Sequence, residues 1–126
     1  MSPRASSATT HELSQIGLLA ELPGEVLAKL ANRMTREQIR SGEAPVVERE
    51  PGDRFYVVLS GILAVSNVGG LGPRRVLRPG DYFGEVALAM DVPRTASVRA
   101  LTPATVASCD RETFDEFVRP LFADEY

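Results

Sequence analysis

The stretch that decides the fold runs from Tyr82 to Ala96 and reads YFGEVALAMDVPRTA. Gly84 precedes a short apolar run, and the N–H groups in the first turn of a helix have no partner within that helix. These donors and the positive end of the helix dipole attract an anion, and a residue without a Cβ lets the anion approach closely. Pro93 prevents the helix from continuing, and the planar guanidinium of Arg94 can bind two phosphate oxygens at once. The stretch therefore predicts a phosphate site.

Glu85 lies next to this predicted site, although a carboxylate repels a phosphate. An ionised glutamate only accepts hydrogen bonds, so its natural partner is a hydroxyl donor. A ribose phosphate carries both a hydroxyl and a phosphate, and Glu85 and Arg94 together predict a ligand of this kind. The alternative from spacing alone is a structural salt bridge between the two side chains.

The segments FGEVAL at residues 83–88 and PRTA at residues 93–96 resemble the phosphate-binding cassette of cyclic nucleotide-binding domains. These domains are the regulatory modules of cyclic-AMP-dependent protein kinase, cyclic-nucleotide-gated channels and catabolite activator proteins. The resemblance implies that Arg94 pairs with the cyclic phosphate and that Glu85 accepts a hydrogen bond from the ribose 2′-hydroxyl. The ligand-binding residues that it implies are Phe83, Gly84, Glu85, Val86, Ala87, Leu88, Pro93, Arg94, Thr95 and Ala96.

Thr95 bears on which base is preferred. By resemblance, a hydroxyl directly after the arginine can accept a hydrogen bond from the amino group of guanine, and can also reach the phosphate. The expected ligand is a cyclic purine mononucleotide, cyclic AMP or cyclic GMP, with cyclic AMP favoured by a modest margin. The alternative is that Thr95 only begins the next strand.

Composition is typical of one globular domain that lacks a catalytic or metal centre. The chain has 126 residues, of which 44% are hydrophobic and 25% charged. Its net charge of −3 offers no basic surface for nucleic acid. A single histidine, His11, excludes a histidine-rich metal site, and no cofactor is expected. The lone Cys109 cannot form an intrachain disulfide and is expected to be a packing residue.

The sequence also indicates a cytoplasmic location and no enzymatic activity. No apolar run approaches the length of a membrane helix, and the start of the chain lacks the apolar region of a signal peptide. No set of residues suited to catalysis occurs together in the sequence. We therefore expect a cytoplasmic binding module.

The rest of the pattern predicts a mainly β fold with helices at both ends. Residues 1–9 are rich in Ser, Ala and Thr and are expected to be a disordered lead. Residues 10–34 have helical spacing, with Thr10 as the N-cap. From Thr35 onward, short apolar runs alternate with Gly and Pro, which is typical of a β-sandwich or barrel. The strands expected are 46–48, 55–59, 62–66, 75–78, 96–100 and 104–108.

Two of these strands, 55–59 and 62–66, are expected to pair as a hairpin, and residues 69–73 to form a mobile tip. Asp110 should cap a final helix over residues 110–118, which Pro120 stops or kinks. By resemblance, the elements form an antiparallel jelly roll (β-roll) over 36–109, flanked by N-terminal and C-terminal helices, in a cyclic nucleotide-binding domain over 10–126.

The chain departs from the family pattern at three places. Arg49 stands where a turn glycine is common and is strained if its φ is positive. Pro45 suits only an edge or the start of a strand, and neither residue is expected to touch the ligand. The family has a further helix as a lid over the base, whereas only residues 119–126 remain here. We expect a truncated lid in a chain cut from a longer protein; the alternative is that Phe122 or Tyr126 stacks on the purine.

The leading functional interpretation is a sensor that binds a cyclic nucleotide and relays this to an effector domain or protein outside this chain. A ligand can bias an output only by its differential affinity for two states. The movable parts are expected to be the helices at Leu13–Met34 and Phe114–Tyr126, because the β-roll itself should be rigid. Two alternatives stay open: a degenerate domain that serves as a protein-interaction scaffold, and the sensor half of a catabolite-activator-type transcription regulator. This piece alone is not expected to bind nucleic acid.

Overall fold

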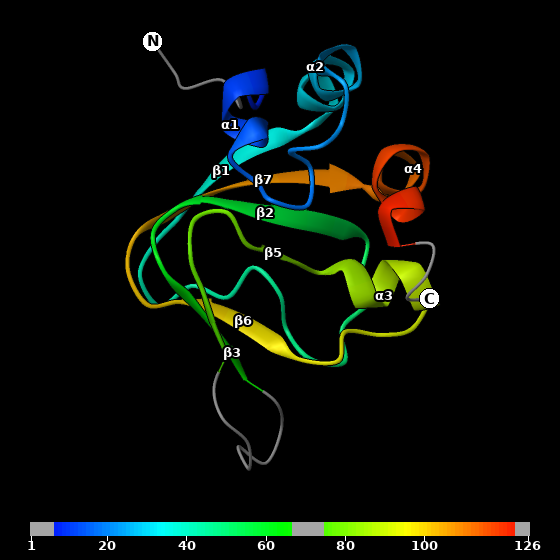
Figure 1. Ribbon diagram of the computed structural model, residues 1–126. Coiled ribbons are helices and arrows are strands. Elements are labelled where there is room, and N and C mark those ends of the chain that lie inside the picture. The colour runs from blue at the N-terminus through cyan, green and yellow to red at the C-terminus, as the bar shows by residue number, and fades with distance from the viewer. Residues whose placement is uncertain (1–6, 67–74, 123–126) are drawn as a thin grey trace, which may run out of the picture.

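The computed structural model describes residues 7–66 and 75–122, which form two antiparallel sheets with helices at both ends (Figure 1). The first sheet has the strand order β1-β7-β2-β5 and the second the order β4-β3-β6. The antiparallel β-roll predicted from the sequence is therefore confirmed. The strands are β1 (Thr35–Ile39), β2 (Arg54–Ser60), β3 (Leu63–Ser66), β4 (Arg75–Leu77), β5 (Tyr82–Phe83), β6 (Ser97–Ala100) and β7 (Ala104–Asp110).

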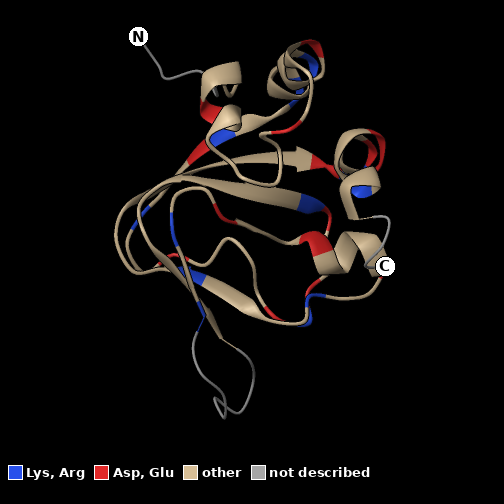
Figure 2. Ribbon diagram, viewed as in Figure 1, with Lys and Arg blue, Asp and Glu red and all other residues tan. Residues whose placement is uncertain are grey.

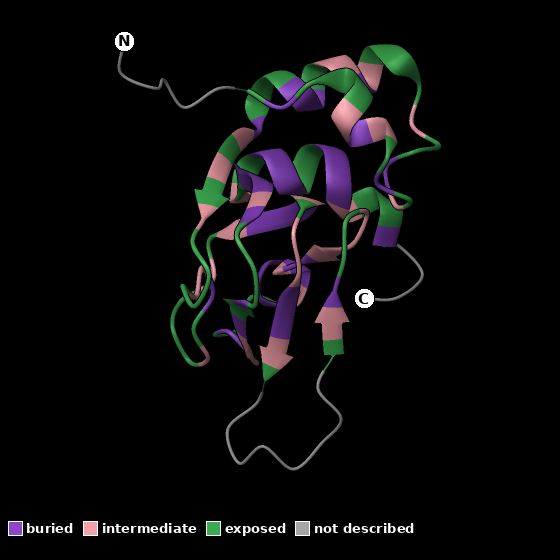
Figure 3. Ribbon diagram, turned by 90° about the vertical axis from the view of Figure 1, so that its left-hand side faces the viewer, coloured by how far each residue is buried: buried purple, intermediate pink, exposed green. Residues whose placement is uncertain are grey.

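The helices pack on the outer face of the first sheet, and their buried sides lie against it in Figure 3. No helix within the described ranges has the length and apolarity that a membrane span requires. The helices are α1 (Thr10–Ser14), α2 (Gly24–Arg33), α3 (Glu85–Met90), α4 (Arg111–Thr113), the π-helical η1 (Phe114–Val118) and the 3-10 helix η2 (Arg119–Phe122).

Strand β2 separates two hydrophobic cores. Successive side chains of a strand point to opposite faces. Phe55 and Val57 face the helices, whereas Tyr56 and Val58 face the second sheet. All four are buried, which explains why this strand is an unbroken apolar run in the sequence. Both cores reach the cassette, residues 82–96, because Phe83 belongs to the core between the sheets and Leu88 to the core under the helices.

The predicted disordered lead over residues 1–9 is wrong where it is described. Ala8 is only 5% exposed and packs into the helical core. Thr9, not Thr10, caps α1. Its hydroxyl accepts from the Glu12 N–H at 3.0 Å, and its own N–H donates to the Glu12 carboxylate at 2.9 Å. These two bonds form a capping box, which fixes the start of the helix.

The strand predicted over residues 46–48 is not formed. Val46 makes only an isolated bridge to Val98, and Pro45 before it has no N–H with which to extend the pairing. The structure instead has β1, which pairs antiparallel with β7. The other predicted strands correspond to β2, β3, β4, β6 and β7.

Residues 55–59 and 62–66 do not pair as a hairpin, contrary to the prediction. β2 pairs with β5 and β7 in the first sheet, whereas β3 pairs with β4 and β6 in the second. The chain crosses between the sheets at Gly61, which has a φ of 85°. An added Cβ there would lie 2.6 Å from the Ala104 Cα, so only glycine fits this crossing. The predicted mobile tip at 69–73 lies outside the described residues.

The C-terminal segment starts as predicted and then leaves the α-helical form. The Asp110 carboxylate accepts from the Thr113 N–H at 2.9 Å, which confirms the N-cap. The chain continues as the π-helical η1 and then η2, in which Pro120 has no N–H for a helical bond. Phe122 is 3% exposed and packs on Tyr82 with a ring separation of 5.5 Å. Its predicted role as a base-stacking lid is therefore wrong, and Tyr126 lies outside the described residues.

Candidate functional site

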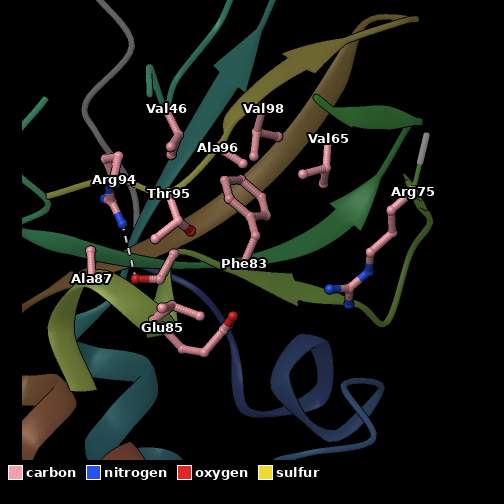
Figure 4. A pocket seen from close by; sticks show the side chains of 12 residues that line it. Val46, Val65, Arg75, Phe83, Glu85, Ala87, Arg94, Thr95, Ala96 and Val98 are labelled. Carbon is pink, nitrogen blue, oxygen red and sulfur yellow. Dashed lines mark hydrogen bonds between the residues drawn. The ribbon is translucent and has the colours of Figure 1, made fainter. Parts of the chain in front are cut away.

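A cavity of about 120 Å³ lies between the cassette and the second sheet (Figure 4). All the predicted site residues except Leu88 and Pro93 line it. The segments that meet there are the cassette, the isolated bridge of Val46, and one end of the second sheet. The lining residues are Val46, Val65, Arg75, Phe83, Gly84, Glu85, Val86, Ala87, Arg94, Thr95, Ala96 and Val98.

Leu88 and Pro93 are the two predicted site residues that the fold places elsewhere. Leu88 is fully buried among the side chains of the helical core, because it lies on the face of α3 that packs on the first sheet. Pro93 is exposed in the loop after α3. The sequence motif includes both residues. A motif does not show whether a side chain lines the cavity or only supports the conformation of the backbone around it.

Gly84 shapes the start of α3. Its φ of 89° is in the left-handed region, and it is the N-cap of the helix, which begins at Glu85. An added Cβ would lie 2.9 Å from the Arg54 carbonyl oxygen and 3.0 Å from Arg94 Nη1. Glycine is therefore required both by the backbone conformation and by the closeness of the arginine. Glu85, the next residue, is 9% exposed and lines the cavity.

Arg94 is 6% exposed, and its guanidinium is bound to two backbone oxygens. Nη1 donates to the Gly84 carbonyl at 2.9 Å and Nη2 to the Arg54 carbonyl at 2.8 Å. A guanidinium has more N–H donors than these two bonds use, so it can also hold an anion. The predicted alternative is wrong, because no Glu85–Arg94 salt bridge occurs among the ion pairs of the described residues.

The charge of Arg94 persists despite its burial. Burial lowers the pKa of the guanidinium, and nearby Tyr56 and Asp53 act in the opposite direction. An arginine starts from so high a pKa that it remains protonated at neutral pH. The site therefore presents a partly desolvated positive charge, held by two backbone carbonyls and favoured by the nearby Asp53 and Glu85 carboxylates.

The backbone of Arg94 is held by the turn at Arg49. The Arg49 N–H donates to the Arg94 carbonyl at 2.8 Å, and the Arg94 N–H donates to the Glu50 carbonyl at 2.9 Å. Arg49 has a φ of 72°, the positive value anticipated from the glycine that the family often has there. Neither Arg49 nor Pro45 lines the cavity, so the expectation that they do not touch the ligand stays a prediction, but both lie next to residues that form the site. The turn fixes Arg94, and Val46 lines the cavity.

Gly52 gives the Arg94 side chain its space. An added Cβ at Gly52 would contact the Ala87 Cβ and would lie 2.9 Å from Arg94 Nε. The sequence pattern Pro51-Gly52 indicates only a turn, so this packing role was not predicted. No local signal in the sequence identifies it, because Ala87 and Arg94 reach Gly52 only through the fold.

Arg75 is a cavity residue that the sequence analysis missed. In the second sheet, Val65 is in register with Arg75 on one side and with Val98 on the other. Cross-strand partners share a face, so these three side chains form a row on the inner face. In Figure 4, Arg75 and Arg94 lie at opposite sides of the cavity with Phe83 between them. Alternation in the short strand β4, where Leu77 is buried, is the signal that places Arg75 on the inner face.

The described part of the chain contains neither a cluster of metal ligands nor an exposed thiol. Within residues 7–66 and 75–122, no group of three or more His, Cys, Asp or Glu side chains is arranged to hold a metal ion. Cys109 is fully buried, and this burial raises the pKa of its thiol to about 12. It is a packing residue, as predicted, and not a reactive thiol.

Comparison with known proteins agrees with this geometry. Residues 36–120 match the family model of the cyclic nucleotide-binding domain. The cAMP-dependent protein kinase regulatory subunit of Yarrowia lipolytica is 38% identical over 109 residues, which are 86% of this chain and 29% of that protein. The chain therefore spans less than a third of the length of this curated relative.

Two solved structures show the same fold. The cAMP-bound PfPKA-R has a TM-score of 0.83 and 27% identity, over 91% of this chain and 40% of the other. The regulatory domain of Toxoplasma gondii PKA, co-crystallised with cAMP, has a TM-score of 0.80 and 29% identity, over 93% of this chain and 49% of the other.

Proposed function

Since the chain belongs to the cyclic nucleotide-binding domain family, we propose that it is a regulatory sensor module that binds a cyclic purine mononucleotide in the cavity at the cassette. One observation carries the proposal: a buried arginine, whose guanidinium is held by backbone carbonyls, and a buried glutamate line the same cavity. Arg94 is held with donors to spare for a phosphate, and Glu85 supplies an acceptor for a ribose hydroxyl. No free phosphate or free sugar needs both groups.

Cyclic AMP is the first ligand to consider, because the relatives are named as cAMP-dependent and two similar structures contain cAMP. The proposal has three parts. The chain binds this ligand, it does so through the site residues of the cassette, and it catalyses no reaction. The effector that responds to the bound nucleotide is proposed to be another domain or another protein, outside this chain. Acidic and basic residues are interspersed along the described chain, which does not favour nucleic acid as the ligand (Figure 2).

Calorimetric titration of the 126-residue chain with cyclic AMP, cyclic GMP and 5′-AMP tests the proposal. We expect saturable binding of a cyclic nucleotide and much weaker binding of 5′-AMP, because the open phosphate carries an additional charge and does not have the compact ring. Absence of heat with both cyclic nucleotides would refute the proposal and favour the scaffold alternative. Equal binding of 5′-AMP would show a general phosphate site instead.

Arg75 and Thr95 suggest that cyclic GMP remains competitive with cyclic AMP. A guanidinium donates to both O6 and N7 of guanine, whereas adenine presents a donor at the corresponding edge. Arg75 lies across the cavity from Arg94, so a ligand whose phosphate is bound by Arg94 would extend its base towards Arg75. The structural alternative is that Arg75 is an inward-facing charge on the edge strand β4, which prevents pairing with another sheet.

Competition titrations separate these roles of Arg75. We expect Arg75→Ala to weaken cyclic GMP about fivefold or more relative to cyclic AMP, because a good bidentate contact gives about 1–3 kcal/mol of discrimination. Thr95→Ala should act in the same direction but more weakly. Arg78→Ala, in the exposed turn after β4, is the matched control. If Arg75→Ala changes both affinities equally, Arg75 does not contact the base.

A further inference from the structure

Tyr56 lies directly behind the candidate site without lining it. It is 7% exposed and belongs to β2, where its cross-strand partner in β5 is Phe83. Both side chains are part of the core between the two sheets. The cavity lining includes Phe83 but not Tyr56, so an effect of Tyr56 on a ligand has to pass through its neighbours.

The Tyr56 ring stacks on the Phe83 ring. The two ring centroids are 4.7 Å apart, and the ring planes are only 3° from parallel. In Figure 4, the Phe83 ring lies in the cavity between Arg94 and Arg75. A ring that is packed face to face on another in a close-packed core has little freedom to turn. Tyr56 therefore fixes the orientation of the aromatic wall that Phe83 gives to the cavity.

The edge of the Tyr56 ring meets Gly84 and Arg94 at one point. A Cβ added at Gly84 would lie 3.4 Å from Tyr56 Cδ2 and 3.0 Å from Arg94 Nη1. The ring thus closes the space beside the Gly84 backbone. Gly84 is the N-cap of α3, and its carbonyl accepts from Arg94 Nη1. A shift of Gly84 would therefore displace both the start of α3 and the guanidinium, which are the two anion-binding parts of the site.

We propose that Tyr56 is a positioning residue of the nucleotide site, because one ring supports both the phosphate end at Gly84 and the aromatic wall at Phe83. The proposal rests on the proposed function, since it needs a ligand in the cavity. The supporting part is the ring and not the hydroxyl, because ring carbon atoms make both the stack and the contact at Gly84. Phenylalanine can therefore replace Tyr56, whereas an aliphatic side chain cannot.

Phe55 is the matched control, because it is next to Tyr56 on β2 and faces the opposite side of the sheet. It is fully buried in the helical core, where its ring lies 6.0 Å from that of Tyr82 and 5.5 Å from that of Phe114. Replacing either aromatic residue of β2 with leucine removes ring contacts and destabilises the fold. The ring partners of Phe55 do not line the cavity, whereas Phe83 does.

The experiment is calorimetry with cyclic AMP and with its Sp and Rp phosphorothioate diastereomers. The proteins compared are the wild type, Tyr56→Leu, Tyr56→Phe and Phe55→Leu. In each diastereomer, sulfur replaces a different one of the two exocyclic phosphate oxygens, so a guanidinium and N–H donors in fixed positions bind the two unequally. Partial unfolding of a variant lowers both apparent affinities by the same factor. The ratio of the two affinities therefore reports on the geometry around the phosphate and not on stability.

For Tyr56→Leu we expect cyclic AMP to bind about threefold more weakly or worse, the effect of losing one aromatic pair. The ratio between the diastereomers should fall towards one in the same variant. Tyr56→Phe and Phe55→Leu should both keep the wild-type ratio. If Tyr56→Leu does not fold, Tyr56→Met takes its place, because methionine fills irregular space but has no ring to stack.

The proposal is overturned if Tyr56→Leu loses less than about threefold in affinity or keeps the wild-type diastereomer ratio. It is also overturned if Tyr56→Phe loses as much as Tyr56→Leu, because the hydroxyl would then carry the effect. An equal change of the ratio in Phe55→Leu overturns it too, since any loosening of β2 would then suffice.

Two results for the wild type itself have different consequences. If it binds cyclic AMP but does not distinguish the diastereomers, the proposal is overturned, because there is no fixed phosphate geometry for Tyr56 to hold. If it binds no cyclic nucleotide at all, the proposed function is refuted, and the proposal that rests on it falls for that separate reason.

Discussion

Gly52→Ala tests how the site holds Arg94. Gly52 does not have a positive φ, so alanine suits its backbone and the effect is one of space alone. The new Cβ would contact the Ala87 Cβ and would lie 2.9 Å from Arg94 Nε and 3.0 Å from its Cδ. Neither Ala87 nor Arg94 can move away easily. Ala87 is part of α3, and the Arg94 side chain is bound at its end to two carbonyls.

To relieve the clash, the Arg94 side chain, helix α3 or both must move. Forcing an extra methyl group into a packed site costs about 1–3 kcal/mol. If the displaced arginine no longer meets the phosphate, the same energy appears as lost affinity, about five- to 150-fold at 1.4 kcal/mol per factor of ten. If the fold absorbs the strain instead, the melting temperature falls by about 4 °C for each kcal/mol.

The measurement pairs calorimetry with cyclic AMP and thermal unfolding without ligand. Gly17→Ala is the control, because an added Cβ at Gly17 meets no atom within 4 Å. We expect Gly52→Ala to lose affinity by at least about fivefold, the lower bound of the overpacking cost, while Gly17→Ala binds like the wild type. Wild-type affinity together with an unchanged melting temperature in Gly52→Ala would refute the reasoning, since the added methyl group would then have disturbed neither Arg94 nor the fold.

Three other predictions concern the charged groups. Arg94→Ala should weaken cyclic AMP by about a hundredfold or more, because removing one side of a buried charge pair costs about 3–5 kcal/mol; calorimetric binding within a few-fold of the wild type would contradict the site. In the wild type, 2′-deoxy cyclic AMP should bind more weakly than cyclic AMP by about 1.5–3 kcal/mol, but in Glu85→Gln the two should bind nearly alike; equal losses in both proteins would contradict a Glu85–hydroxyl bond. Hydrogen bonds from Thr113 hold the pKa of Asp110 below its usual 3.8, so its stabilisation is present above that pH and is lost as the pH falls towards the lower, folded-state pKa. Asp110→Asn should therefore lose less of its thermal stability on acidification than the wild type does, and an identical acid profile would show that the cap carries no such charge effect.

Features that depend on neighbours along the chain were predictable from the sequence. Gly84 and Arg94 stand ten positions apart within a single turn-helix-loop unit, so their meeting needs no knowledge of distant segments. Asp110 caps its helix by a bond to Thr113, three residues later. The positive φ of Arg49 is likewise a local property of its turn. In each case the interaction is set by the covalent connection over a few residues, which residue type and spacing describe well.

Only the tertiary structure decided how the distant segments combine. A glycine such as Gly61 predicts where one strand ends, but not in which sheet the next strand lies. The sheet depends on which distant strand pairs with the next strand and buries its apolar side chains. The same dependence brings Arg75 across the cavity from Arg94 and places the guanidinium of Arg119 on the carbonyls of α3. These contacts join residues many positions apart, and their geometry follows from the packing of both hydrophobic cores. A local sequence pattern does not predict that packing.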